Sequence, residues 1–161
     1  MTTEQLRHRM PPILKALKER SLRGRTPVEG LRRTECAYHG WDTVHADAAS
    51  WEPFAPGDAF GGLEAHHCFK GTVTLPEASA GKRVVCLVST GASDIWNNNN
   101  PQFLAYVDGR LVCGLDVNHN EFDLAACAVP GESHELALYV YCNTPARDVF
   151  LRVETAERDD D

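Results

Sequence analysis

The sequence predicts an all-β fold, a β-sandwich of the jelly-roll type preceded by a short N-terminal helical arm. From Ala65 onward, apolar and polar residues alternate with a period of two, in segments rich in β-branched and aromatic residues. Turn-forming residues separate these segments at near-regular intervals, and this spacing is typical of sandwiches and jelly rolls.

Seven segments combine this alternation with flanking turn residues, and we expect strands at 65–75, 83–90, 102–108, 111–116, 121–129, 134–142 and 147–154. The pair Asp108-Gly109 is the strongest hairpin signal. It stands between two apolar segments, and a type I′ turn needs positive φ at both central positions, which Asp and Gly tolerate.

The N-terminal residues follow a helical period instead. Apolar residues recur at helical spacing over residues 3–21, and this predicts an amphipathic segment. Pro11-Pro12 interrupts it, so we expect two short helices. The predicted organisation is a helical arm and linker over residues 1–50, a sandwich over 51–156, and a loose acidic tail over 157–161. Within the first range, residues 23–50 are expected to be the linker and to contain a few turns.

Charge is divided unevenly along the 161 residues. Residues 1–33 hold nine Lys/Arg against three Asp/Glu, whereas residues 34–161 hold seven against twenty. The acidic body argues against a nucleic-acid partner, because phosphate binding needs a basic face. The sequence contains no run of about 18 apolar residues, so no membrane span is predicted. The N-terminus lacks the apolar core of a secretory signal, so a cytoplasmic location is expected.

The cysteines fit a reducing compartment. The six cysteines include no Cys-x-x-Cys pair. They are Cys36, Cys68, Cys86, Cys113, Cys127 and Cys142. Four of them fall in apolar strand patterns, where a free cysteine behaves as a small buried hydrophobe. Three disulfides remain an alternative if the chain is exported. The spacing does not fit a zinc cluster, and no cofactor or metal is predicted.

One candidate carbohydrate site is the segment that begins at Trp96 and continues through Asn97, Asn98 and Asn99. An indole face stacks on a pyranose ring, and amides donate to and accept from hydroxyl groups. The alternative is an ordinary polar loop. Trp41 and Trp51 are interpreted as anchors for the linker.

A second candidate is the turn that contains Asp116, Asn118 and His119. It resembles the start of a calcium-binding loop, but Glu121 stands where the sharp turn needs Gly and Cys127 where the loop needs a bidentate Glu. The alternatives left open are a structural polar turn, a contact with a sugar or another domain, and a metal site.

The adjacent residues His66 and His67 raise the alternative of a cupin-like metal site. Chelation in that fold uses His-x-His, so that both imidazoles leave the same face of a strand. Adjacent residues point to opposite faces. We therefore expect one of the two histidines to point inward and to be hydrogen-bonded.

Several short sequence motifs occur in a fixed order between residues 51 and 153. They are Gly61-Gly62, then Phe69-Lys70-Gly71-Thr72-Val73-Thr74-Leu75-Pro76, then Tyr106-Val107-Asp108-Gly109, and then Gly114, Asp116, Asn118, His119 and Glu121. This series resembles the β-domain that precedes the catalytic barrel in α-mannosidases of glycoside hydrolase family 38. The resemblance implies a galactose-binding-like sandwich. In that family the zinc ligands and the Asp nucleophile come from the barrel, and they carry over to no position here.

These observations predict a non-catalytic accessory domain that packs on a catalytic barrel or another protein, so this chain alone is not expected to be an enzyme. The alternatives are a free-standing carbohydrate-binding module and a metal-dependent jelly-roll protein. A flat exposed apolar patch would favour a lost partner domain, and a concave groove lined by aromatic and polar groups would favour a sugar ligand. The oligomeric state is left open.

Overall fold

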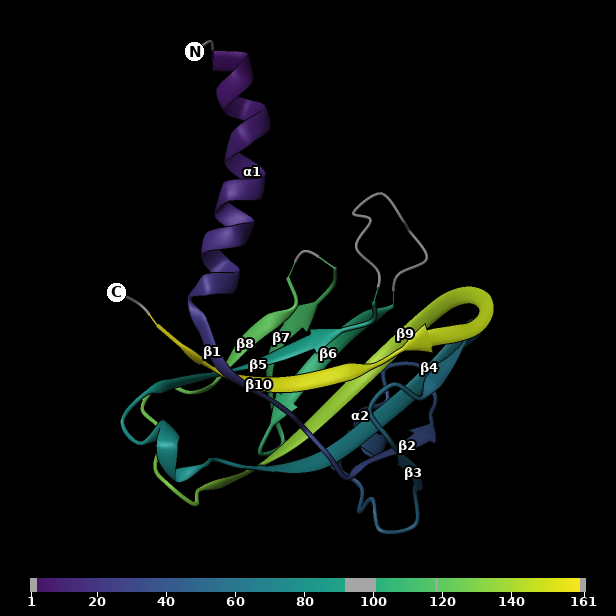
Figure 1. Cartoon of the computed structure of the whole chain (residues 1–161). Helices are drawn as coiled ribbons and strands as arrows, with labels where there is room; N and C mark the ends of the chain where they lie inside the picture. Colours follow the sequence, from purple (N-terminus) through teal and green to yellow (C-terminus); the bar gives the residue numbers. More distant parts are fainter. Residues whose placement is uncertain (1–2, 92–100, 118, 160–161) are drawn as a thin grey trace.

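The computed structural model describes residues 3–91, 101–117 and 119–159. Two antiparallel sheets pack face to face, and a long helix projects away from them (Figure 1). The predicted all-β sandwich with an N-terminal helical arm is therefore confirmed. Within the described residues, no helix is both long enough and apolar enough to cross a membrane.

Among the described residues, the smaller sheet contains four strands. In spatial order they are β1 (Leu22–Pro27), β10 (Arg152–Arg158), β5 (Arg83–Ser89) and β8 (Glu121–Ala125). The β-branched segment Val84-Val85 lies in β5, between two strands, and is fully buried. The short 3₁₀ helix η1 (Glu77–Ser79) precedes β5.

The larger sheet has six strands in the part of the chain that the structure describes. In spatial order they are β3 (Glu52–Phe54), β2 (Leu31–Glu35), β4 (Ala59–Thr74), β9 (Ser133–Phe150), β6 (Gln102–Val107) and β7 (Arg110–Leu115). β4 and β9 are the longest strands and pair along most of their length. β7 and β3 are the outer strands, and the helix α2 (Trp41–His45) lies in the connection between β2 and β3.

The main core lies between the sheets. Phe69 of β4 and Leu138 of β9 face Cys86 of β5 and Val153 of β10 in one apolar cluster. A second, smaller cluster lies on the opposite face of the larger sheet. There Trp51 and Val44 cover Cys68, Tyr106 and Tyr139. Of the two tryptophans interpreted as anchors, Trp51 is buried in this cluster, whereas Trp41 is 58% exposed.

The prediction of two short helices is wrong, since one helix, α1 (Thr3–Arg20), runs through Pro11 and Pro12. Proline has the φ of a helical residue, and its penalty of about 3 kcal/mol comes from the lost hydrogen bond and a clash one turn back. Two adjacent prolines concentrate these losses in one turn, and the helix continues beyond them.

The prediction of a linker over residues 23–50 is also wrong. β1 pairs with β10 and β2 pairs with β4, so this range supplies a strand to each sheet. Both strands are mostly polar in sequence, and this composition did not predict strands. β1 is an outer strand and is mostly exposed. The predicted tail differs too: Glu157 and Arg158 belong to β10, and Asp159 forms an ion pair with Arg23.

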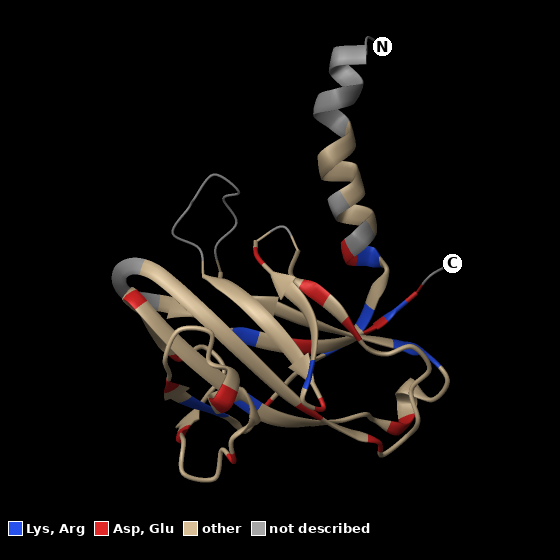
Figure 2. Ribbon diagram, turned by 180° about the vertical axis from the view of Figure 1, so that it is seen from behind, with Lys and Arg blue, Asp and Glu red and all other residues tan. Residues whose placement is uncertain are grey.

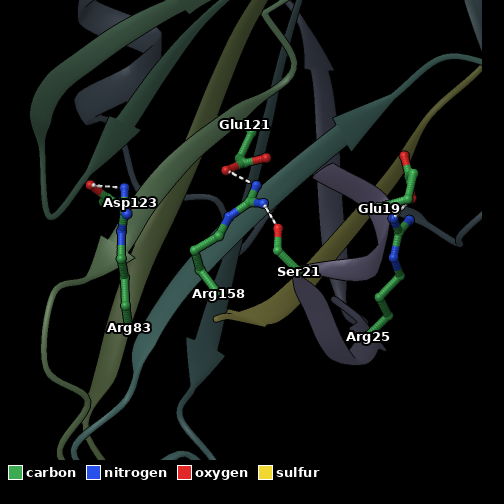
Figure 3. Close-up of polar contacts among 7 residues, drawn as sticks. All are labelled: Glu19, Ser21, Arg25, Arg83, Glu121, Asp123 and Arg158. Atoms are coloured by element: carbon green, nitrogen blue, oxygen red, sulfur yellow. Dashed lines mark hydrogen bonds and ion pairs between the residues drawn. The ribbon is translucent and has the colours of Figure 1, made fainter. Parts of the chain in front are cut away.

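Polar contacts hold the end of α1 to the smaller sheet (Figure 3). Arg158 bonds both Ser21, after α1, and Glu121 of β8. Arg83 of β5 binds Asp123 of β8 at 2.7 Å. The C-terminal end of the described chain therefore lies beside the base of α1, as Figure 1 also shows.

The predicted hairpin is confirmed. Asp108 and Gly109 have φ of 50° and 74°, and Val107 pairs with Arg110 across the turn. The described Asp and Glu residues are scattered over strands and loops of the sandwich (Figure 2).

Candidate functional site

The outer face of the larger sheet carries a hollow of about 620 Å³, a size within the range of ligand pockets. It lies beside the second apolar cluster. The lining comes from the loop after β2, from β4, β6, β7 and β9, and from the loop after β7. It consists of Tyr38, His39, Glu64, His66, Gln102, Phe103, Leu104, Gly114, Leu115, Asp116, Tyr139 and Tyr141.

Strand register explains the floor of this hollow. His66 of β4 lies opposite Tyr141 of β9, which lies opposite Gln102 of β6. Directly opposite residues share one face of a sheet. The next row outward on the same face contains Tyr139 and Leu104, and Gly114 of β7 follows beside Leu104. Gly114 has no side chain, so the floor stays open at that end.

The wall is the segment after β2, which carries Tyr38 and His39. It is held against the sheet at its far end by Lys70, a buried cation that donates to the carbonyl of Ala46 at 2.8 Å and pairs with Glu135 at 3.2 Å. Gly40 lies close over Tyr139, because a Cβ there would be 2.5 Å from the Tyr139 ring. The wall is thus fitted to the floor.

A hydrogen-bonded chain joins wall and floor. The His39 backbone N–H donates to the Tyr139 hydroxyl at 3.2 Å, and that hydroxyl lies 2.7 Å from Nδ1 of His66. When the Tyr139 hydroxyl donates to Nδ1, the proton of the His66 ring is on its other nitrogen. That nitrogen is then a hydrogen-bond donor on the lining. Burial raises the pKa of Tyr139, so its hydroxyl stays protonated at neutral pH.

A second hydrogen bond orients the carboxylate. The Tyr141 hydroxyl donates to Oε1 of Glu64 at 2.8 Å, and this bond raises the pKa of Tyr141. Glu64 sits at an irregularity of β4 with a φ of 53°. The bulge exposes the carboxylate, because the extra residue re-aims the side chain.

Aromatic rings surround these polar groups. Tyr38 meets the His66 ring edge-on, with centroids 5.7 Å apart, and the His66 ring stacks on Tyr139 at 5.9 Å. Tyr38 is 70% exposed and offers a ring to solvent at the rim. The hollow therefore combines an exposed aromatic ring, oriented hydrogen-bonding groups and two carboxylates, those of Glu64 and Asp116, and the described lining includes no Lys or Arg.

The sequence-predicted residues are only partly brought together. Asp116 lies on the lining. His119 does not line the hollow, but its backbone N–H donates to the Asp116 carboxylate at 2.7 Å, which fits the predicted polar turn. Trp96, Asn97, Asn98, Asn99 and Asn118 lie outside the described residues.

The expectation for the two adjacent histidines is confirmed. His66 faces the hollow, whereas His67 is buried and bonds the Gly61 carbonyl at 3.2 Å. Burial lowers the pKa of His67, so it is neutral at pH 7. Over the chain that the structure describes, no three His, Cys, Asp or Glu side chains are grouped to hold a metal ion.

Sequence reasoning missed Tyr38, Glu64, Tyr139 and Tyr141. The alternation in 134–142 did place Tyr139 and Tyr141 on one face of a strand, which was the available signal. Tyr38 stood in the range interpreted as linker, and Glu64 preceded the predicted start of its strand.

No family model matches the chain, and no curated protein matches it by sequence. Solved structures do match. A β-glucuronidase from Ruminococcus gnavus in complex with D-glucuronic acid superposes with a TM-score of 0.60 at 9% identity, covering 85% of this chain and 30% of that one. The β-glucuronidase of Faecalibacterium prausnitzii gives 0.53 at 15% identity, covering 85% and 32%.

A β-glucuronidase from an uncultured Clostridium species gives a TM-score of 0.57 at 9% identity, covering 85% of this chain and 29% of that one. At these identities the match shows the fold alone. The chain has the β-sandwich fold of one part of these glycoside hydrolases, and it spans about a third of their length. The coarser part of the sequence resemblance is thereby supported, and its α-mannosidase specifics are not.

Proposed function

We propose that this chain is a non-catalytic β-sandwich module of the glycoside-hydrolase type, and that the hollow on its larger sheet binds a carbohydrate. The observation that carries the proposal is the composition of the lining. The exposed Tyr38 ring can stack on the C–H face of a pyranose, while His66, Gln102 and Glu64 supply donors and acceptors for hydroxyl groups.

The charge of the lining narrows the ligand. Glu64 and Asp116 contribute carboxylates, and no Lys or Arg in the described lining offsets them. A uronic acid would bring a third carboxylate near these two, and like charges at close range repel. A neutral sugar avoids this repulsion, and an amino sugar gains attraction. We therefore propose a neutral or amino sugar as ligand, in contrast to the uronic acid bound by the Ruminococcus gnavus enzyme.

Isothermal titration of the full chain with neutral, amino and uronic monosaccharides and their short oligomers tests this proposal. Tyr38→Ala is expected to weaken binding roughly tenfold, because one stacking contact is lost. Gly114→Leu, which fills the open end of the floor, is expected to abolish it. Trp41→Ala is the matched control, since Trp41 is 58% exposed in the same connection but does not line the hollow.

Two results would contradict the proposal. One is the absence of heat or signal change with every sugar. The other is binding that Trp41→Ala weakens while Tyr38→Ala and Gly114→Leu leave it intact. A clear preference for uronic acids would reject the ligand class and keep the carbohydrate site.

A second candidate function, packing on a catalytic barrel or another protein, is favoured by α1. Met10, Ile13, Leu14 and Leu17 are all exposed and recur at helical spacing on a helix that projects from the sandwich (Figure 1). Such a stripe normally faces another surface. Sedimentation of the wild-type chain and of an Ile13→Lys, Leu17→Lys variant tests whether the stripe packs on a second copy of the chain. Identical behaviour at all concentrations would count against self-association through this stripe.

A further inference from the structure

Two cysteines beside the hollow are in contact. Cys36 follows the last residue of β2, and Cys68 lies within β4. Their Sγ atoms are 3.4 Å apart. A disulfide bond is about 2.05 Å long, so the two atoms need to approach by about 1.4 Å to be joined.

The backbone places both side chains on one face. Cys36 N–H donates to the carbonyl of His66 at 3.0 Å, which continues the pairing of β2 with β4. Cys36 lies opposite His66 and shares its face of the sheet. Cys68 is two residues beyond His66 in β4, so it projects from that same face. Cys36 begins the connection that leaves the sheet, which gives it more freedom to move than a residue inside a strand.

The two thiols differ in access and acidity. Cys36 is partly exposed, whereas Cys68 is buried. The Cys68 thiol donates a hydrogen bond to Cys36, and this bond lowers the pKa of Cys36 and raises that of Cys68. Thiolate is the reactive form of cysteine, so Cys36 is the nucleophile that reaches solvent.

We propose that Cys36 and Cys68 form a reversible dithiol–disulfide site that controls the order of the pocket wall. The oxidant is a low-molecular-weight disulfide such as oxidised glutathione. The Cys36 thiolate attacks one of its sulfurs, forming a mixed disulfide and expelling one thiolate. The Cys68 sulfur then attacks Cys36 Sγ, loses its proton and expels the second thiolate. Two protein thiols are oxidised and one small disulfide becomes two thiols.

The position of the pair connects this chemistry to the hollow. In the wall, Tyr38 and His39 follow Cys36 after one intervening residue, Ala37, and His66 of the floor lies two residues before Cys68. A bond between the cysteines would tie wall to floor and reduce the freedom of Tyr38. This coupling rests on the proposed carbohydrate site, whereas formation of the disulfide does not.

The test treats the full chain with oxidised glutathione, alkylates the remaining thiols and maps the peptides by mass spectrometry. The expected product is a Cys36–Cys68 cross-link that dithiothreitol reverses. Its expected effect is a rise in Tm of roughly 5–15 °C, because the bond constrains the unfolded chain. Cys68→Ala should stop at a glutathione adduct on Cys36. Cys127→Ser, which alters an exposed cysteine elsewhere, should behave as the wild type.

An adduct on Cys36 that does not resolve in the wild type, or a cross-link that uses other cysteines, would overturn the proposed site. With the cross-link formed, sugar affinity should rise several-fold, and an unchanged affinity would overturn the coupling to the wall. If no sugar binds in either redox state, the proposed carbohydrate site fails and the coupling fails with it, while the cross-link result still decides the disulfide.

Discussion

The two faces of the larger sheet are made by the same strands but have opposite character. His67 and Phe69 of β4 point into the space between the sheets, where Phe69 is completely buried in an apolar cluster. His66, one residue away, points to the other face, where it bonds a tyrosine hydroxyl and lines a hollow. The period of two in a strand thus places core residues and hollow-lining residues on opposite faces of one segment.

The inner face should be the more sensitive to truncation. Phe69→Ala removes a ring that packs edge-on against Phe54 and Phe60, and it is expected to lower the free energy of unfolding by about 3–5 kcal/mol. Tyr141→Phe on the outer face removes only the hydroxyl bonded to Glu64 and should cost about 1 kcal/mol or less. Urea denaturation of both variants measures the difference, and equal losses would contradict the division between the faces.

The packing of the wall on the outer face should be disrupted by the addition of one methyl group at Gly40. Gly40→Ala puts a Cβ 2.5 Å from the Tyr139 ring at a φ of 52°, so both a clash and backbone strain are expected, about 2–4 kcal/mol in all. Gly30→Ala is the matched control, since its φ of 71° is equally strained but nothing lies within 4 Å. It should cost about 1 kcal/mol. If thermal unfolding shows equal losses, the wall is not packed on Tyr139.

Acid should act on the inner face through His67. Burial depresses its folded-state pKa below the ordinary 6.5, so the unfolded chain binds the proton more readily. Stability is therefore expected to fall as pH drops below 6.5 and to level off below the folded-state pKa, with a slope of at most about 1.4 kcal/mol per pH unit.

His67→Gln should remove this slope in denaturation curves between pH 7 and pH 5. The control, His119→Gln, changes an exposed histidine and should keep it. A slope that persists in His67→Gln would assign the acid sensitivity to another group.

The smallest effect is expected at the hairpin. His134 and the Glu135 N–H bond Asp108 at 2.9 Å each, and they lower the pKa of this carboxyl below 3.8. The ionised Asp108 carboxylate therefore contributes to folding stability above its unfolded-state pKa. This contribution is lost as pH falls below 3.8 through the folded-state pKa.

Asp108→Asn keeps a residue that tolerates positive φ and loses the charge. Because Asp108 is half exposed, the expected loss of stability at pH 7 is below about 1 kcal/mol, and it should vanish in acid. A difference between wild type and variant that stays constant from pH 7 to pH 2 would show that the charge is not responsible.

Beyond the fold class, the features predicted correctly from sequence were local ones. Asp108-Gly109 determines its own turn, and the opposite orientations of His66 and His67 follow from strand periodicity alone. β1 could not be predicted, because its polar residues meet only the edge of a sheet and carry no alternation. The start of β4 was placed too late, since Gly61-Gly62 and the bulge near Glu64 interrupt the pattern.

The hollow was beyond sequence reasoning for a different reason. Its wall and floor, Tyr38 and Tyr141, lie about a hundred residues apart in the chain and meet only through the pairing of β2 with β4 and of β4 with β9. Asp116 was singled out from its turn, and it lies on the lining directly after β7. The cytoplasmic location and the absence of catalysis remain predictions.

The most direct test of the central claim is a map of amide chemical shifts by NMR during titration with an amino sugar or a neutral sugar. The expected result is saturable shifts confined to residues 38–39, 64–66, 102–104, 114–116 and 139–141, and their loss in Gly114→Leu. Shifts centred on Trp96 and the asparagines that follow it, or no shift with any sugar, would contradict a carbohydrate site on the outer face of the larger sheet.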